Sequence, residues 1–394
     1  MKHRNELQVQ IDDVYACTGR CPGCMLADFE RKVRTPDMSL EILELSITRL
    51  KEYVQTLGRL DRINITFGIA DHMVINNDDY IIDLHNKAAE IIDLVNPKER
   101  HYSSVFFSTS LIGKQAVMIE RMKYIKNNLK YPGVSMIPVV VFDPDLMRRQ
   151  KFGDKYREMI LEVKEIFNKV DLSINISHET VTEFSPEKIH DFAADHGFDE
   201  LTINWVPTLD NLQYTAVDFD KLADWLIKFD ERLQEKNIIS SSYRPVLLRT
   251  IDAAMCFKDE DWSIHRSVQS LLPNTFPKSI QIDHHGNLVP KMEAIGDVSH
   301  LERFGYNLIG NIRDESIQNI VNKGMDIIGS RIMSAHLLSK QCQKCDVAPI
   351  CAGTGFHVVN NVLRKKQKED LTSDCPHIAR KLIYHFREQI KELV

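Results

Sequence analysis

The first two hundred residues alternate short β-like runs with amphipathic helical runs. The expected strands are Leu7–Asp13, Arg62–Phe67, Ser104–Thr109, Val134–Phe142, Asp171–Ser177 and Glu200–Trp205. Helices are expected to begin near Ser39, Asp78, Lys114, Asp154 and Ser185. Ser39 is a good N-cap for its helix, and Gly58 is a typical residue for the end of that helix. Strands alternating with helices predict parallel strands joined by right-handed crossovers.

Most of these strands carry apolar residues on one face only. Strands buried on both faces read as continuous apolar runs, and only Val134–Phe142 does so here. The two faces of the first strand carry Leu7, Val9 and Ile11 against Gln8, Gln10 and Asp12. A closed eight-stranded barrel is filled with branched apolar side chains. We therefore expect an incomplete barrel whose polar face lines a cavity. An antiparallel sheet with one wet face is the alternative, and the intervening helices disfavour it.

The pattern changes in the second half of the chain. Phe219–Glu235 is expected to form one long amphipathic helix, and Ser240–Ser242 with Pro245 a linker. From Cys256 onward the chain reads as loop-rich and holds five of the eight cysteines. We expect three regions, namely a barrel over 1–210, a helical bridge over 211–255 and a cysteine-rich domain over 256–394.

Composition narrows the classes of function. The 394 residues include 50 Lys and Arg against 56 Asp and Glu, so the formal net charge is −6. This balance gives no support to nucleic-acid binding. The first seven residues lack the apolar region of a signal peptide, and Val134–Phe142 is too short to span a membrane. We expect a cytoplasmic protein, in which eight cysteines indicate metal ligands or redox groups before disulfides.

Three cysteines follow the first expected strand as C-x3-C-x2-C, at Cys17, Cys21 and Cys24. Three thiolates on one loop can bind a [4Fe–4S] cluster and leave one iron open. Two other interpretations remain. A zinc site would need a fourth ligand, which His3 or His72 could supply. A redox dithiol would need only Cys21 and Cys24.

This motif in a β/α domain resembles the radical S-adenosylmethionine (SAM) superfamily. The resemblance implies a partial barrel of six β/α units in which Cys17, Cys21 and Cys24 hold the SAM-binding cluster. Such enzymes cleave SAM to a 5′-deoxyadenosyl radical that abstracts hydrogen from a substrate. The residue before the third cysteine is usually aromatic in this family and here is Gly23.

The resemblance also implies where SAM binds. The family's Gly-Gly-Glu-Pro segment corresponds to Phe67–His72, in which Gly68 fits and Asp71 could replace the acid. By position alone, three further SAM contacts are expected at Ser108, Ser135 and Asn175. Ordinary polar residues at strand ends are the alternative for each of these three.

A second cysteine group lies near the end of the chain. Its members are Cys342, Cys345, Cys351 and Cys375, spaced C-x2-C-x5-C with one distant cysteine. Four thiolates would fully ligate a [4Fe–4S] cluster or a zinc ion. The region resembles the SPASM extension of peptide-modifying radical SAM enzymes. The supporting landmarks are a hairpin over Ile282–Pro290 and a Gly-Asn-Ile turn over Gly310–Ile312.

That resemblance implies one auxiliary [4Fe–4S] cluster. Lys291 and Gly355 occupy positions where cysteines of another auxiliary cluster would stand. We therefore predict two clusters in total, with Cys256 a buried or free thiol. His284 and His285 are expected to point to opposite faces of the hairpin.

The expected function is a radical SAM oxidoreductase acting on a peptide or protein side chain. A flavodoxin or ferredoxin would supply electrons, and a separate leader-binding protein could present the substrate. Glu293 is the candidate catalytic base. Two alternatives stay open: a radical SAM enzyme for a small molecule, and a zinc-stabilised scaffold without catalysis.

Overall fold

The fold is taken from a computed structural model. It describes residues 6–15, 17, 37–68, 70–75, 77–95, 102–142, 153–175, 178–198, 200–204, 219–235, 240–241, 279–290, 309–325, 380–382 and 384–385. Within these residues ten strands form one sheet in the order β10-β9-β8-β1-β2-β3-β4-β5-β6-β7. The first six are β1 (Glu6–Ile11), β2 (Arg62–Phe67), β3 (Ser104–Thr109), β4 (Ser135–Val141), β5 (Asp171–Asn175) and β6 (Glu200–Asn204). They pair in chain order, and every pair is parallel.

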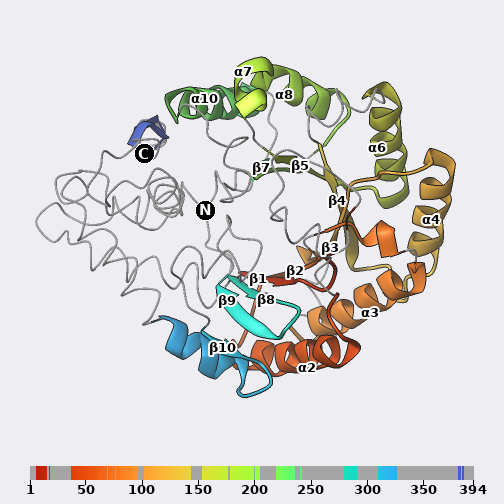
Figure 1. The fold of residues 1–394 in the computed structure, drawn as a ribbon, viewed down its shortest axis with the longest axis vertical. Helices are drawn as coiled ribbons and strands as arrows, with labels where there is room; N and C mark the ends of the chain where they lie inside the picture. The colour runs from red at the N-terminus through yellow and green to blue at the C-terminus, as the bar shows by residue number, and fades with distance from the viewer. Residues whose placement is uncertain are drawn as a thin grey trace, which may run out of the picture.

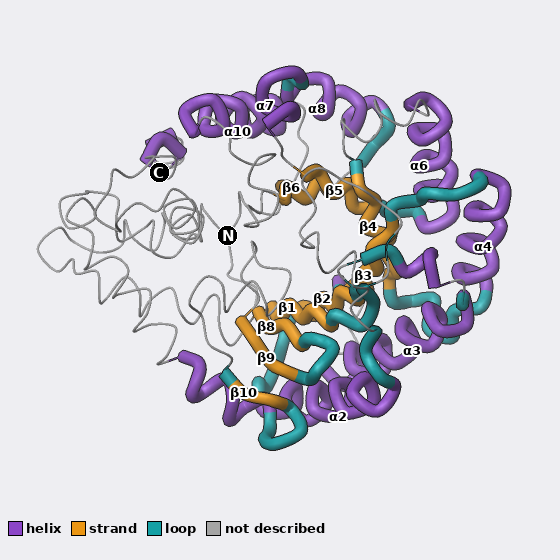
Figure 2. Tube along the Cα trace, in the orientation of Figure 1, coloured by secondary structure: helices purple, strands orange, loops and turns teal. Residues whose placement is uncertain are grey.

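Helices connect these strands and lie on one side of the sheet. They are α2 (Leu40–Thr56), α3 (Asp78–Val95), α4 (Gln115–Asn127), α6 (Gly153–Phe167), α7 (His178–Glu183), α8 (Pro186–Asp195) and α10 (Phe219–Glu235), with the 3-10 helix η1 (His72–Ile75). Figure 1 and Figure 2 show the strands as an arc with the helices around its outside. The expected partial (β/α)6 barrel is confirmed.

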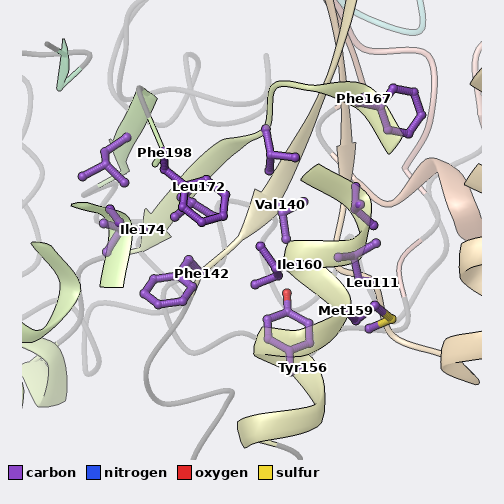
Figure 3. Packing of buried hydrophobic residues seen from close by; sticks show 14 of the residues in the cluster. Leu111, Val140, Phe142, Tyr156, Met159, Ile160, Phe167, Leu172, Ile174 and Phe198 are labelled. Carbon is purple, nitrogen blue, oxygen red and sulfur yellow. The ribbon is translucent and has the colours of Figure 1, made fainter. Parts of the chain in front are cut away.

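The alternation of residues along the strands decides which face is buried. In β2, Ile63, Ile65 and Phe67 are buried, whereas Asn64 and Thr66 are half-buried. The apolar face packs under the helices in two large clusters. Figure 3 shows part of one cluster, where side chains from α6 lie against those of β4 and β5. The polar face is left toward the inside of the arc, as the alternation predicts.

The ends of α2 follow local chemistry. The Ser39 side chain accepts a hydrogen bond from the Ile42 amide at 3.3 Å, which caps the first turn. After the helix ends, Gly58 has a φ of +69°, a left-handed conformation that favours glycine. Both boundary signals read from the sequence are confirmed.

The sheet extends beyond the six central strands at both edges. Ser240–Ser241, expected in a linker, form strand β7, which pairs with β6. At the other edge β8 (Ser279–Ile282) pairs in parallel with β1. The Asp12 amide also donates to the Ile282 carbonyl at 2.8 Å. The first strand of the chain therefore pairs with a strand that lies about 270 residues later in the sequence.

The hairpin expected near residue 286 is present. β8 pairs in antiparallel with β9 (Asn287–Pro290), and β9 pairs with β10 (Gly310–Asn311). The Asn311 amide group donates to the His285 carbonyl and to the Asn287 side chain, each at 3.0 Å. A helix follows over residues 317–325. The Gly-Asn-Ile turn thus closes the hairpin onto the edge of the barrel.

Candidate active site at the carboxyl end of the sheet

Cys17 lies just beyond the carboxyl end of β1. It is half-buried and packs against a small cluster of Val14, Tyr15 and Ala70. Its predicted co-ligands Cys21 and Cys24 lie outside the described residues. The first of the three predicted cluster cysteines is thus placed where the parallel strands end. That edge is where barrels of this architecture carry their active sites.

The segment that carries the three cysteines runs from residue 14 to residue 37 and is called the cysteine loop below. Its two ends are held together by hydrogen bonds. The Asp13 carbonyl accepts from the Met38 amide at 2.9 Å. The Tyr15 amide donates to Oδ1 of Asp37 at 3.0 Å. These two bonds close the base of the loop on the end of β1.

The Asp13 carboxylate is buried in a charged contact. Nε2 of His72 lies 3.1 Å from both Asp13 oxygens, and both side chains are 0 % exposed. The Tyr80 hydroxyl from α3 donates to Oδ2 of Asp13 at 2.9 Å. Because Asp13 takes up Nε2 of His72, that nitrogen is already engaged.

Protonation of these groups follows from their surroundings. Burial opposes a charge on His72, but the Asp13 carboxylate and its hydrogen bond outweigh burial and raise the pKa of His72. Burial, followed by the nearby Asp13 charge, raises the pKa of Tyr80. The Asp13 carboxylate therefore favours the protonated form of His72, and burial favours the neutral phenol of Tyr80.

Asp12 lies next to this pair on the polar face of the sheet. Its two oxygens accept from the side-chain amide of Gln10 at 2.8 Å and from that of Gln281 at 2.5 Å. Burial raises the pKa of the Asp12 carboxyl well above its ordinary value. The two amide hydrogen bonds lower this pKa, and the Asp283 carboxylate adds to the rise. The β8 strand thus supplies a direct partner to a buried acid at the end of β1.

The segment after β2 packs closely around His72. Gly68 has a φ of +73°, and a Cβ atom there would lie 2.2 Å from Cε1 of His72. Asp71 is buried, and its Oδ1 accepts from the Met73 amide at 3.0 Å while its Oδ2 accepts from the Ser110 hydroxyl. Both Asp71 oxygens therefore have partners within the protein, and Gly68 is required for the close approach of the ring.

The structure brings together some of the predicted SAM contacts. Gly68, Asp71 and Ser108 lie at the carboxyl ends of β2 and β3, and Ser108 is half-buried. Asn175 ends β5 at the same edge. Ser135 is the first residue of β4 and pairs with Ser104 at the start of β3. At about 3.3 Å per residue it lies roughly 13 Å along the strands from Ser108, apart from the other contacts.

The two histidines of the hairpin differ from the expectation. They lie in the turn between β8 and β9 and not on the strands, and their ring centroids are 3.9 Å apart. The expected opposite orientation is wrong because a turn does not alternate side chains as a strand does. The His284 ring also meets the Tyr15 ring edge-on, with centroids 4.6 Å apart. The hairpin therefore contacts the start of the cysteine loop.

Several predicted residues lie outside the described part of the chain. They are Glu293, Cys256, Cys342, Cys345, Cys351 and Cys375. Their predicted roles stay predictions. Among the described helices, none is long and apolar enough to cross a membrane.

The buried network itself is the part of the site that the motif search missed. Its centre is Asp12, Asp13 and His72, and none of these was assigned a functional role beyond the zinc alternative for His72. Two adjacent acids at the end of the first expected strand and before the cysteines are the available signal. Charged residues are almost never buried unless they are paired. Acids at the end of a buried strand therefore indicate partner side chains elsewhere in the chain.

The donor set at this edge suits an iron–sulfur cluster. Thiolates are the usual ligands of such clusters, and Cys17 leads the cysteine loop from a half-buried position. In the described residues around it, the charged side chains Asp13 and His72 are already paired with each other. The spacing of the motif predicts Cys17, Cys21 and Cys24 as the residues that would hold such a cluster.

The comparisons with known proteins agree with this fold. No family model matches the chain, and no curated protein matches its sequence. Among solved structures, the radical SAM enzyme anSMEcpe with bound AdoMet superposes with a TM-score of 0.58 at 13% identity, over 98% of both chains. SuiB of Streptococcus suis, solved with its precursor peptide SuiA, gives a TM-score of 0.55 at 14% identity, over 92% of this chain and 74% of SuiB. The expected partial (β/α)6 barrel is thus shared with these two structures.

Proposed function

We propose that this chain is a radical SAM oxidoreductase that abstracts hydrogen from a peptide or protein side chain. The observation that carries the proposal is the position of the C-x3-C-x2-C motif. It opens at the carboxyl end of β1 in a partial barrel, on a loop whose base is closed by two hydrogen bonds, from the Met38 amide to the Asp13 carbonyl and from the Tyr15 amide to Asp37. The peptide class is supported by SuiB, a structural neighbour that was solved bound to a precursor peptide.

Cys17, Cys21 and Cys24 would bind three irons and leave the fourth open to SAM. When bound, a [4Fe–4S] cluster supplies one electron to the sulfonium of SAM, which releases methionine and a 5′-deoxyadenosyl radical. A hydrogen atom taken from the substrate then gives 5′-deoxyadenosine and a substrate radical. Cys342, Cys345, Cys351 and Cys375 would hold the auxiliary cluster, which would supply a one-electron acceptor for the substrate radical.

The predicted SAM contacts divide by their placement. Gly68 and Ser108 lie beside the strand ends and are the proposed direct contacts, with Asn175 at the same edge. Both oxygens of Asp71 are engaged by Ser110 and the Met73 amide, so Asp71 would act by shaping the segment after β2. Ser135 is the first residue of β4, at the amino end of the parallel strands, and is left out of this proposal.

Anaerobic reconstitution of the full chain tests the proposal. Iron and sulfide are counted, then SAM and dithionite are added and 5′-deoxyadenosine is assayed. We expect about eight irons per chain for two [4Fe–4S] clusters, and SAM cleavage that disappears in Cys17→Ala. A chain that loads zinc in place of iron and leaves SAM intact would instead be a structural scaffold.

A further inference from the structure

Asp13 takes part in one of the two hydrogen bonds that close the cysteine loop. Asp13 receives the returning chain through its carbonyl, which accepts from the Met38 amide at 2.9 Å. Its own amide donates to the Ile11 carbonyl at 3.0 Å, and the Gly68 amide donates to that same carbonyl at 2.8 Å. Asp13 therefore lies where the two ends of the cysteine loop come together, next to the segment that follows β2.

The side chain of Asp13 ties that point to two other elements. His72 contacts both carboxylate oxygens at 3.1 Å from η1, and Tyr80 donates to Oδ2 at 2.9 Å from α3. His72 packs in turn on Gly68, which leaves no room for a Cβ atom. The end of β1 therefore contacts Gly68, Gly68 contacts His72, and His72 contacts Asp13 at the end of β1 again. Because these contacts link back on themselves, the base of the loop can move little relative to β2.

This arrangement exceeds what packing alone requires. A fully buried ion pair contributes little net stability compared with apolar side chains of similar volume, although breaking it is costly. His85 on α3 shows that a histidine can be buried in this fold without a charged partner. Its Nε2 lies 3.2 Å from the Val134 carbonyl. The Asp13–His72 pair instead fixes the relative orientation of the two side chains, since charged hydrogen bonds are short and geometrically specific.

We propose that Asp13, His72 and Tyr80 form a positioning triad that fixes the base of the cysteine loop, and with it Cys17, relative to β2 and α3. The proposal rests on the proposed function insofar as the loop holds the cluster. None of the three side chains is assigned contact with the reacting atoms. Their effect passes through the hydrogen bonds of Asp13 and Tyr15 that close the loop.

The first test needs no cluster. Hydrogen exchange of the Tyr15 and Met38 amides is measured in the cluster-free full-length chain for His72→Gln, Asp13→Asn and Tyr80→Phe. The matched control is His85→Gln, which alters a buried histidine at the other end of the sheet. We expect exchange at both amides to become at least about tenfold faster in His72→Gln and Asp13→Asn, as expected when a charged hydrogen bond is lost. The control should match the wild type at these amides.

The second test follows the loaded protein by electron paramagnetic resonance of the reduced cluster, with and without SAM. Wild type and His85→Gln are expected to share one signal and one SAM-induced shift. His72→Gln and Asp13→Asn should bind iron yet show a broadened signal with a diminished shift. Tyr80→Phe removes a single hydroxyl, so it is the variant to interpret if the other two fail to fold, and an intermediate change is expected.

The outcomes separate the two proposals. Wild-type protein that takes up no iron would overturn the proposed function, while amide exchange would still judge the triad. Normal iron and SAM cleavage in the wild type, with all three triad variants matching His85→Gln in exchange and resonance, would overturn the triad alone. Faster exchange at Tyr15 and Met38 confined to the triad variants would support it.

Discussion

His72 and His85 are both fully buried, yet their pKa values shift in opposite directions at the two ends of the sheet. At the carboxyl end, the Asp13 carboxylate outweighs burial and raises the pKa of His72. At the amino end, burial dominates and lowers the pKa of His85, whose nearest partner is the Val134 carbonyl. A buried carboxylate is therefore the partner of the histidine at one end of the barrel, and a backbone carbonyl is the partner at the other. The comparison indicates that the charged pair at the carboxyl end serves to fix geometry more than to add stability.

The largest expected effect comes from removing one member of the charged pair. His72→Leu leaves the Asp13 carboxylate buried with only the Tyr80 hydroxyl as a side-chain donor. We expect a loss of about 3–5 kcal/mol in the free energy of unfolding. His85→Leu removes a single neutral hydrogen bond and should cost about 1 kcal/mol. Urea unfolding at neutral pH measures both, and equal losses would remove the distinction between the two ends.

A second effect is steric and compares two glycines with similar backbone angles. Gly68 and Gly58 have φ of +73° and +69°, but only Gly68 has the His72 ring in the space of a Cβ atom. Gly58→Ala should cost about 1 kcal/mol through its left-handed backbone. Gly68→Ala should cost about 2–4 kcal/mol, because overpacking adds to the backbone term. Thermal unfolding of both variants, read against wild type, tests the difference.

A third effect depends on pH and concerns Asp12. Its raised pKa means that its contribution to stability is present below its ordinary value of 3.8 and is lost as pH rises through the folded-state value. Asp12→Asn removes this titration while keeping a side chain of similar size. The variant should therefore gain stability relative to wild type as pH rises. Urea unfolding of both proteins at acidic and at slightly alkaline pH gives the sign, and a gap that does not change with pH would contradict it.

The last prediction concerns the pKa values of three buried histidines in the wild-type protein, which nuclear magnetic resonance measures. His72 should titrate above 6.5, His85 below 6.5 and His190, buried between α8 and α10, at about 4. Protonation of His72 favours the folded state, and this contribution is lost as pH rises through its pKa. Protonation of His85 or His190 favours unfolding as pH falls. Signals assigned through single His→Gln variants would expose any reversal of this order.

The fold was accessible from the sequence because its main signals are local. Alternation in Arg62–Phe67 and capping at Ser39 depend on neighbours within a few residues, and both match the structure. Strand β7 was taken for a linker because Ser240–Ser241 has no apolar side chain, and its pairing with β6 is a tertiary contact. Short edge strands are held by their partner strand and carry little propensity of their own.

The site was only half accessible for the same reason. Cysteine spacing predicts Cys17 as a cluster ligand from residues that are close in the sequence. The partners of Asp12 and Asp13 are distant, at Gln281 on β8 and His72 on η1, and no spacing rule joins them. Asp71 was matched by motif position, but its oxygens are engaged by Ser110 and a backbone amide. Burial and pairing were therefore the missing information.

The pairing of β8 with β1 also has a consequence for biosynthesis. Val9 on the first strand pairs with Ile280, so this edge of the sheet stays open until translation has passed that residue. At about 5–20 residues per second the nascent chain waits on the order of tens of seconds. Throughout that time Asp12 lacks its Gln281 partner, and the free edge of β1 can pair with another chain. Chaperone capture of nascent chains that end before β8 is the expected result, and completion of the hairpin is the event that releases them.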